Sequence, residues 1–343
     1  MRWCDEEFFK LGAYQAVVGT ENILLAKGGE LSEAHSFQSS HEAIFYLKDF
    51  FTNQYLVYKP RETKLVSRAE LLEELNITGP GFEIISNEDQ TYERDFTQLL
   101  QSFGHDLNKV VLISRENYKT QNFKEAQKAL FVKSLCFGTG TPYGFWNADY
   151  GICGSTPEIL FTLSESTLKT FALAGTAKVG QEQELLSSTK DRYEHKLVID
   201  DLKEKLAPFS QSVEVAETHL LSFKNIIHLK TDVSAKLKSD ADLAELTSSL
   251  SPTAALGGYP KDAALYFLKQ TQYQQNHPKR FFGSAFGITS QAFTQFIVMI
   301  RNVQWQQDHF FIESGGGVVP DSQLDREIDE IKLKRSVIRN HYL

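Results

Sequence analysis

Short runs of β-branched and aromatic residues recur along the chain, and they constrain its fold more than any other feature. They occupy residues 110–114, 143–146, 158–162, 168–173, 296–300 and 309–312. Several runs are separated by short turns, which is typical of antiparallel strands rather than of regular βαβ units. Apolar residues at helical spacing predict helices at 188–206 and 263–270. We therefore predict an α+β fold with large antiparallel sheets packed against helices.

The chain contains no internal repeat, low-complexity tract or Pro/Ser-rich linker. The lack of a linker favours a single intertwined domain over two separate ones. Hydrophobic residues make up 41% and charged residues 23% of the 343 residues, so the chain can bury a core and is not expected to be disordered. Residues 1–100 are less regular in pattern, and we predict that they form a variable N-terminal part of the same domain.

The net charge of −8 argues against a general nucleic-acid-binding surface, which normally carries an excess of basic residues. The 3 cysteines form no CxxC pair and are odd in number, which fits a reducing compartment. No apolar run approaches the length that spans a membrane, and the first residues lack the order of a signal peptide. We expect a cytoplasmic protein that binds neither nucleic acid nor membranes.

Three consecutive glycines, Gly315, Gly316 and Gly317, precede a segment with the pattern of an acidic helix. Because these positions lack Cβ atoms, their backbone N–H groups can approach an anion closely. Glu327, Glu330 and Lys334 share one face of the predicted helix. This combination indicates a site for a small anion and a divalent metal. A glycine turn followed by a solvated helix face is the alternative.

Asp191, Glu194 and His195 also share one helical face, on the helix predicted at 188–206. Two helices that each offer a pair of carboxylates could bracket one Mg²⁺ ion, which takes oxygen ligands. Surface faces held by salt bridges are the alternative. Further segments rich in Gly, Ser and Thr lie at 154–158, 173–177, 251–258 and 283–287. Each alone is typical of a turn, and none is a phosphate-binding loop.

In their order along the chain, these segments resemble the chorismate-utilising enzymes. That family contains isochorismate synthase, salicylate synthase and the first components of anthranilate and aminodeoxychorismate synthases. The residues that carry the resemblance are 109–112, 154–158, 174–176, 191–195, 252–254, Arg301, 314–317, Glu327, Glu330 and Lys334. The resemblance implies the fold of anthranilate synthase component I. It also implies that residues 101–343 form the chorismate-binding catalytic region.

Members of this family differ in the nucleophile that attacks C2 of chorismate. In the isochorismate and salicylate branches, a lysine at the start of a strand is the general base on water, and here that lysine is Lys109. The aminodeoxychorismate branch commonly has a lysine where this chain has Ala174. The resemblance thus implies a water nucleophile activated by a neutral Lys109 amine, with Glu158 as the acid that protonates the departing C4 hydroxyl.

The resemblance also implies which residues hold the metal and the substrate. Glu194 and Glu330 correspond to Mg²⁺ ligands, with Asp191 and Glu327 as water-mediated or outer partners. The residues expected to bind the substrate are Gly175, Thr176, Arg301, Gly315, Gly316 and Lys334. His195 either orients a catalytic group or is a structural histidine.

The implied activity is the Mg²⁺-dependent, reversible conversion of chorismate to isochorismate, which would feed menaquinone or siderophore biosynthesis. The alternatives are salicylate formation, an ammonia-using activity of the anthranilate or aminodeoxychorismate kind, and a non-catalytic chorismate-binding protein. No obligatory glutaminase partner is expected. Ser251 stands where many relatives have histidine, and the chain is short for the family. No tryptophan feedback site of the anthranilate kind is recognisable.

Overall fold

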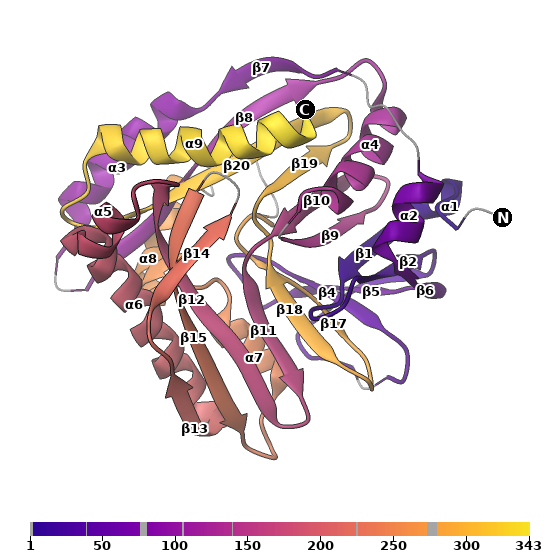
Figure 1. The fold of residues 1–343 in the computed structure, drawn as a ribbon, viewed down its shortest axis with the longest axis horizontal. Coiled ribbons are helices and arrows are strands. Elements are labelled where there is room, and N and C mark those ends of the chain that lie inside the picture. The colour runs from indigo at the N-terminus through magenta and orange to yellow at the C-terminus, as the bar shows by residue number, and fades with distance from the viewer. Residues whose placement is uncertain are drawn as a thin grey trace.

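The computed structural model describes residues 3–38, 40–75, 81–104, 106–138, 140–223, 226–272 and 280–343. Its strands form two large sheets, here called sheet A and sheet B (Figure 1). Neighbouring strands within both sheets run antiparallel. The predicted α+β class with large antiparallel sheets is therefore confirmed.

The strands of sheet A are, in spatial order, β16 (Gly258–Tyr259), β8 (Lys109–Lys119), β20 (His309–Val318), β19 (Asn302–Gln306), β10 (Tyr150–Thr156), β9 (Thr141–Trp146), β1 (Gly12–Ala16), β2 (Asn22–Lys27) and β6 (Glu62–Ser67), with β7 (Glu83–Asn87) paired to β8. The strands of sheet B are β13 (Ser210–Val215), β15 (Ile226–Leu237), β12 (Thr167–Lys178), β11 (Ile159–Ser164), β18 (Thr294–Val298), β17 (Ala285–Thr289), β4 (Ile44–Lys48), β5 (Tyr55–Lys59) and β3 (Glu30–Ala34), with β14 (His219–Phe223) paired to β15.

The helices are α1 (Glu6–Lys10), α2 (Arg68–Glu74), α3 (Asp89–Ser102), α4 (Phe123–Leu135), α5 (Glu182–Ser187), α6 (Thr189–Leu206), α7 (Leu243–Leu250), α8 (Lys261–Thr271) and α9 (Leu324–Tyr342), and a 3₁₀ turn spans Ala207–Phe209. In Figure 1, α9 lies along sheet A and α6 lies along sheet B. Within the described ranges, no helix is both long enough and apolar enough to cross a membrane.

Strands from the first hundred residues enter both sheets. Strands β1, β2, β6 and β7 belong to sheet A, whereas β3, β4 and β5 belong to sheet B. Strand β1 pairs with β9, and β4 pairs with β17, so both connect to strands much later in the chain. This part of the chain is thus interwoven with the rest, while the boundary placed at residue 100 stays a prediction.

Apolar layers form between the sheets and beneath the helices. Phe145 of sheet A and Phe286 of sheet B belong to one buried cluster where the sheets face each other. Trp305 packs with Leu130 of α4 on the helix-covered side of sheet A, and Leu202 of α6 packs into the core of sheet B. Burial of this much apolar surface is the main force that holds the sheets and helices together.

Helix α6 begins where the sequence predicts it. Ser188 is its N-cap, and the Ser188 side chain accepts a hydrogen bond from the Asp191 backbone N–H at 3.2 Å. Its apolar side, which includes Leu197 and Leu202, is buried. The first turns of the same helix carry Asp191 and Glu194. The N-cap and the buried apolar side therefore fix the positions of these two carboxylates for the site described next.

The glycine run is strand rather than turn. Gly315, Gly316 and Gly317 lie in β20, in register with Ile113, Leu112 and Val111 of β8. The other neighbour of β20, strand β19, pairs with it only as far as Phe311 in the described chain. The far edge of β20 at the glycines is therefore not covered by β19, and it borders the pocket described below.

Candidate active site

A pocket of about 70 Å³ lies where β12, β15, β20 and α9 meet. The predicted site residues that line it are Glu158, Gly175, Thr176, Glu194, Arg301, Gly315, Glu330 and Lys334. Lys109, Asp191, Gly316 and Glu327 are not among its lining residues. The structure thus gathers the predicted residues from seven separate segments, with some in the pocket wall and others directly behind it.

Lys109 lies immediately behind the wall, fully buried at the start of β8. Its Nζ is 2.9 Å from Oε1 of Glu194. Gly317 makes this approach possible, because a Cβ there would lie only 2.6 Å from Lys109 Cε and would also overlap the Glu194 carboxylate. Gly317 is a site residue that the sequence reasoning did not single out, although it is the third glycine of the run.

Glu158 lies just before β11 and is 4% exposed. Its backbone N–H donates to Thr156 Oγ1 at 3.1 Å, and Thr253 Oγ1 donates to its side-chain Oε1 at 3.3 Å. Burial raises the pKa of Glu158 to about 7, because the surrounding protein solvates its charged form poorly. The carboxyl group can therefore hold a proton at neutral pH.

Arg301 connects β18 to β19 with a φ of 56°, a left-handed conformation that a non-glycine residue adopts rarely. Its side chain is buried in the pocket wall, and burial lowers its pKa to about 10. The guanidinium is still charged at neutral pH. It can therefore offer its two-pronged donor to a carboxylate in the pocket.

His228 of β15 contacts Arg301 and was not predicted from the sequence. Its Nδ1 is 3.0 Å from the Gly175 carbonyl oxygen, and its Nε2 is 3.4 Å from an Arg301 terminal nitrogen. Because a carbonyl can only accept, Nδ1 carries the hydrogen and Nε2 accepts from Arg301. Burial, with Arg301 nearby, lowers the pKa of His228 to about 3, which keeps the ring neutral. His228 therefore orients Arg301 without adding charge.

The acidic faces of α6 and α9 meet behind the glycines. Lys190 of α6 lies between them, with its Nζ 3.0 Å from Glu327 Oε1 and 3.6 Å from Glu194 Oε2. Asp191 is further away, at 4.0 Å from the same nitrogen. On α9, Lys334 pairs with Glu330 and also donates to the Gly315 carbonyl oxygen at 2.9 Å. Lys190 is a third residue that the sequence reasoning missed, after Gly317 and His228.

The pKa directions show how much negative charge is gathered here. Burial raises the pKa of Glu327, and repulsion from Glu330 raises it further. Burial also opposes the charge on Glu194, but Lys109 and Lys190 outweigh it and lower the Glu194 pKa. These acids in turn raise the pKa of Lys190 despite its burial. The buried carboxylates thus depend on nearby cations for their charge.

The chemistry of this cluster fits a hard divalent cation, whose preferred ligands are carboxylate oxygens. Oε2 of Glu327 is buried and has no hydrogen-bond partner among the residues that the structure describes. Among all the residues that the structure describes, no three Asp, Glu, His or Cys side chains converge at metal-binding distance. Instead, the carboxylates of Glu194, Glu327 and Glu330 are turned toward lysines.

The remaining predicted residues lie around this centre. Thr176 Oγ1 is 3.1 Å from His228 Nδ1, next to the carbonyl of Gly175. Gly316 faces away from the pocket, and a Cβ there would lie 2.8 Å from Glu327 Oε2. His195 Nε2 is 2.8 Å from Thr231 Oγ1, and the ring is not part of the pocket lining. These contacts favour the structural alternative for His195.

The site thus combines a buried arginine, an acid with a raised pKa and a lysine–carboxylate cluster. Two antiparallel sheets enclose it. The chain belongs to the chorismate binding enzyme family, which it matches over residues 45–340. The resemblance inferred from the sequence is therefore confirmed.

Individual relatives agree with this assignment. The chain is 29% identical over 244 residues to isochorismate synthase MenF of Pasteurella multocida, a match that covers 67% of this chain and 56% of that protein. It is 32% identical over 196 residues to the salicylate biosynthesis isochorismate synthase of Pseudomonas aeruginosa, covering 54% of this chain and 40% of that protein. These matches thus span about half the length of the curated relatives.

The fold has a close counterpart among solved structures. The menaquinone-specific isochorismate synthase MenF from Escherichia coli superposes with a TM-score of 0.84 at 19% sequence identity. The superposition covers 97% of this chain and 89% of that one. The strands contributed by the first hundred residues therefore belong to an arrangement that a solved protein shares.

Proposed function

We propose that this protein is an isochorismate synthase that converts chorismate reversibly to isochorismate. The observation that carries the proposal is the placement of Glu158, a buried acid with a raised pKa, in one pocket with Arg301 while Lys109 lies behind that pocket. Family membership supports chorismate as the substrate, and the names of the relatives favour the isochorismate branch.

In the proposed reaction, Lys109 removes a proton from water, which attacks C2 of the ring, and Glu158 protonates the departing C4 hydroxyl. Ala174 lines the pocket at the position where a lysine would allow covalent attack. An apolar residue there supports water rather than an enzyme amine as the nucleophile.

Substrate binding uses the cations and polar groups around the same pocket. Arg301, held by His228, and Lys334 offer positive charge to the carboxylates of chorismate. Gly315 leaves the strand edge open to the substrate, while Gly175 and Thr176 border the ring. The role of Gly316 is then indirect, because the absence of a side chain there leaves room for the Glu327 carboxylate.

Glu194, Glu327 and Glu330 would hold Mg²⁺, with Asp191 as an outer partner. Bound Mg²⁺ would neutralise a substrate carboxylate. It would also bind the negatively charged carboxylate of Glu194, which otherwise pairs with Lys109. The support for this assignment is the gathering of buried carboxylates and the unpartnered Oε2 of Glu327 within the described residues.

The direct test is incubation of the purified protein with chorismate, with and without Mg²⁺, followed by chromatographic identification of products. We expect isochorismate in equilibrium with chorismate, and no conversion after chelation of the metal until Mg²⁺ is restored. Salicylate with pyruvate would instead assign the salicylate branch. Turnover that requires ammonium or glutamine would assign an ammonia-using activity with a glutaminase partner, and binding without turnover would overturn the enzymatic proposal.

The pH profile should report the state of Glu158. Because burial raises its pKa to about 7, Glu158 keeps its proton up to neutral pH and loses it as the pH rises further. A deprotonated Glu158 cannot donate, so kcat/KM for chorismate is expected to fall as the pH rises through about 7. Steady-state rates across neutral and alkaline pH measure this, and a kcat/KM that stays level or rises there would contradict the acid role.

A further inference from the structure

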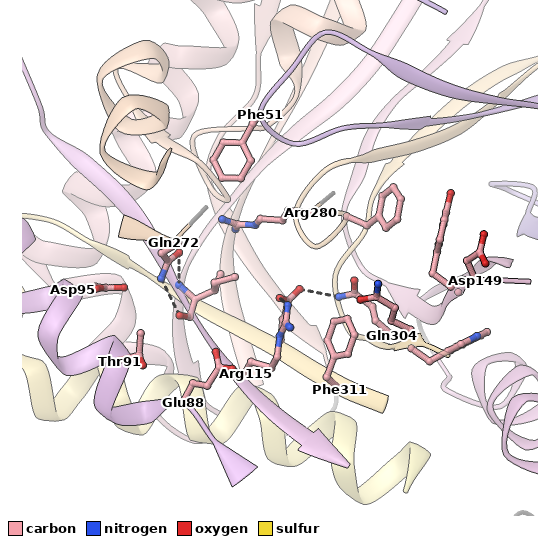
Figure 2. A pocket seen from close by; sticks show the side chains of 17 residues that line it. Phe51, Glu88, Thr91, Asp95, Arg115, Asp149, Gln272, Arg280, Gln304 and Phe311 are labelled. Atoms are coloured by element: carbon pink, nitrogen blue, oxygen red, sulfur yellow. Dashed lines mark hydrogen bonds and ion pairs between the residues drawn. The ribbon is translucent and has the colours of Figure 1, made fainter. Parts of the chain in front are cut away.

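A second cavity, of about 330 Å³, adjoins the candidate active site. Its lining includes Ile113 and Arg115 of β8 and Glu313 of β20. Thr91 of α3 lies at one side (Figure 2). Glu313 lines both cavities. Neither the proposed reaction nor the predicted metal site uses this second cavity.

Arg280 is buried beside this cavity and extends into it, as Figure 2 shows. The residue is 7% exposed, and its guanidinium lies 3.7 Å from the ring centre of Phe50. Its Nε donates to the Phe282 carbonyl oxygen at 3.2 Å. Both terminal nitrogens lack a hydrogen-bond acceptor among the residues that the structure describes. A buried guanidinium with open donors is costly unless an anion joins it.

The other charges inside the cavity are already paired. Arg115 contacts Glu313 at 2.5 Å, and Gln304 donates to the second oxygen of Glu313 at 2.9 Å. Asp95, at the edge of the cavity, pairs with Arg94 at 2.8 Å. Arg280 is therefore the lining cation whose terminal nitrogens have no acceptor among the described residues, and the carboxylate of a ligand would pair with it. Glu88 and Asp149 lie toward the rim, where water screens them.

Aromatic side chains form part of the walls. They are Phe51, Tyr150, Phe281, Trp305 and Phe311. Flat apolar walls favour a planar ring, and a few fixed polar groups then set its orientation. Bidentate donors on Arg280 match the two oxygens of a carboxylate.

We propose that this cavity is a binding site for a small aromatic carboxylate, held by its carboxylate on Arg280 and by its ring between the aromatic walls. The site is separate from the pocket assigned to chorismate, and its occupation does not depend on turnover. The inference therefore goes beyond the proposed function and can be tested without it.

The probe is benzoate, with benzamide as its neutral counterpart of the same shape. Calorimetry with the purified protein should show saturable binding of benzoate at millimolar concentrations or below, and at least tenfold weaker binding of benzamide. Arg280→Met keeps an unbranched apolar stem as far as the Nε position but removes the guanidinium and its charge, and should weaken benzoate binding at least tenfold. Arg301→Met, which alters the chorismate pocket, should leave benzoate binding within about threefold of the wild type.

A second variant guards against misfolding of Arg280→Met. Thr91→Trp, at a half-buried position on α3, should fill the cavity and block benzoate without altering Arg280. Circular dichroism checks the fold of every variant, and if Arg280→Met is unfolded then Thr91→Trp decides. The proposal fails if benzoate does not bind, if benzamide binds equally well, if Thr91→Trp binds benzoate normally, or if Arg301→Met rather than Arg280→Met abolishes binding.

Discussion

Replacing Lys109 with glutamine is expected to lower kcat for isochorismate formation by about 10²–10⁴-fold, the usual contribution of a general base. Glutamine retains a hydrogen-bond donor for Glu194 but cannot take a proton from water. Steady-state assays with saturating chorismate and Mg²⁺ measure the effect. Lys119→Gln is the matched control, because Lys119 lies at the other end of the same strand, is largely exposed and pairs only with Glu83 among the described residues.

The stability of the Lys109 variant must be measured alongside its rate. Lys109 is buried and pairs with Glu194 at 2.9 Å, and removing one partner of a buried ion pair typically costs about 3–5 kcal/mol. Lys190, at 3.6 Å from the other Glu194 oxygen, should soften this loss. A folded variant that turns over chorismate near the wild-type rate would rule out Lys109 as the base.

Glu158→Gln is expected to lower kcat by a similar factor of about 10²–10⁴, because the amide is nearly the same shape but cannot donate an acidic proton. The side chain can still accept the hydrogen bond from Thr253, so the melting temperature should change little. Glu83→Gln, at an exposed position on β7, is the control for loss of a carboxylate.

The pH dependence separates a chemical role of Glu158 from a packing role. In the wild type, the fall of kcat/KM above neutral pH is expected to follow Glu158, whose pKa is about 7. The residual activity of Glu158→Gln should lack this limb. If the variant lost activity but kept the same high-pH limb, another group would be the acid.

Local patterns in the sequence predict helices α6, α8 and α9 and the acidic faces. Helix α6 begins beside Ser188, where the predicted helix begins, and helical spacing places Asp191 with Glu194 and Glu327 with Glu330. Both relations depend on residues within about one turn of each other, so the sequence alone contains them. The strand-like runs also overlap strands of the two sheets, although Glu158 lies before β11 and Met299 and Ile300 lie beyond β18.

The missed residues depend on contacts between distant strands. His228 is a single polar residue in an apolar stretch, and its role appears only once β12 and β15 pair with Thr176 opposite His228. Lys190 gains its role when α9 brings Glu327 to within 3.0 Å of it. The sequence alone predicts an anion-binding cradle at the glycine run. Its place inside a paired strand reflects the space that Lys109 and Glu194 occupy at Gly317.

The order of strands in sheet A affects how this chain can fold during synthesis. Strand β20 is the last strand along the chain, yet it lies between β8 and β19, with Gly316 opposite Leu112. A growing chain on the ribosome therefore presents the bare edge of β8 long before its partner emerges. Such an edge can pair with another chain, and contacts this distant in sequence form slowly. Sheet A is complete only when residues 309–318 leave the ribosome, so nascent chains are expected to need protection from aggregation until then.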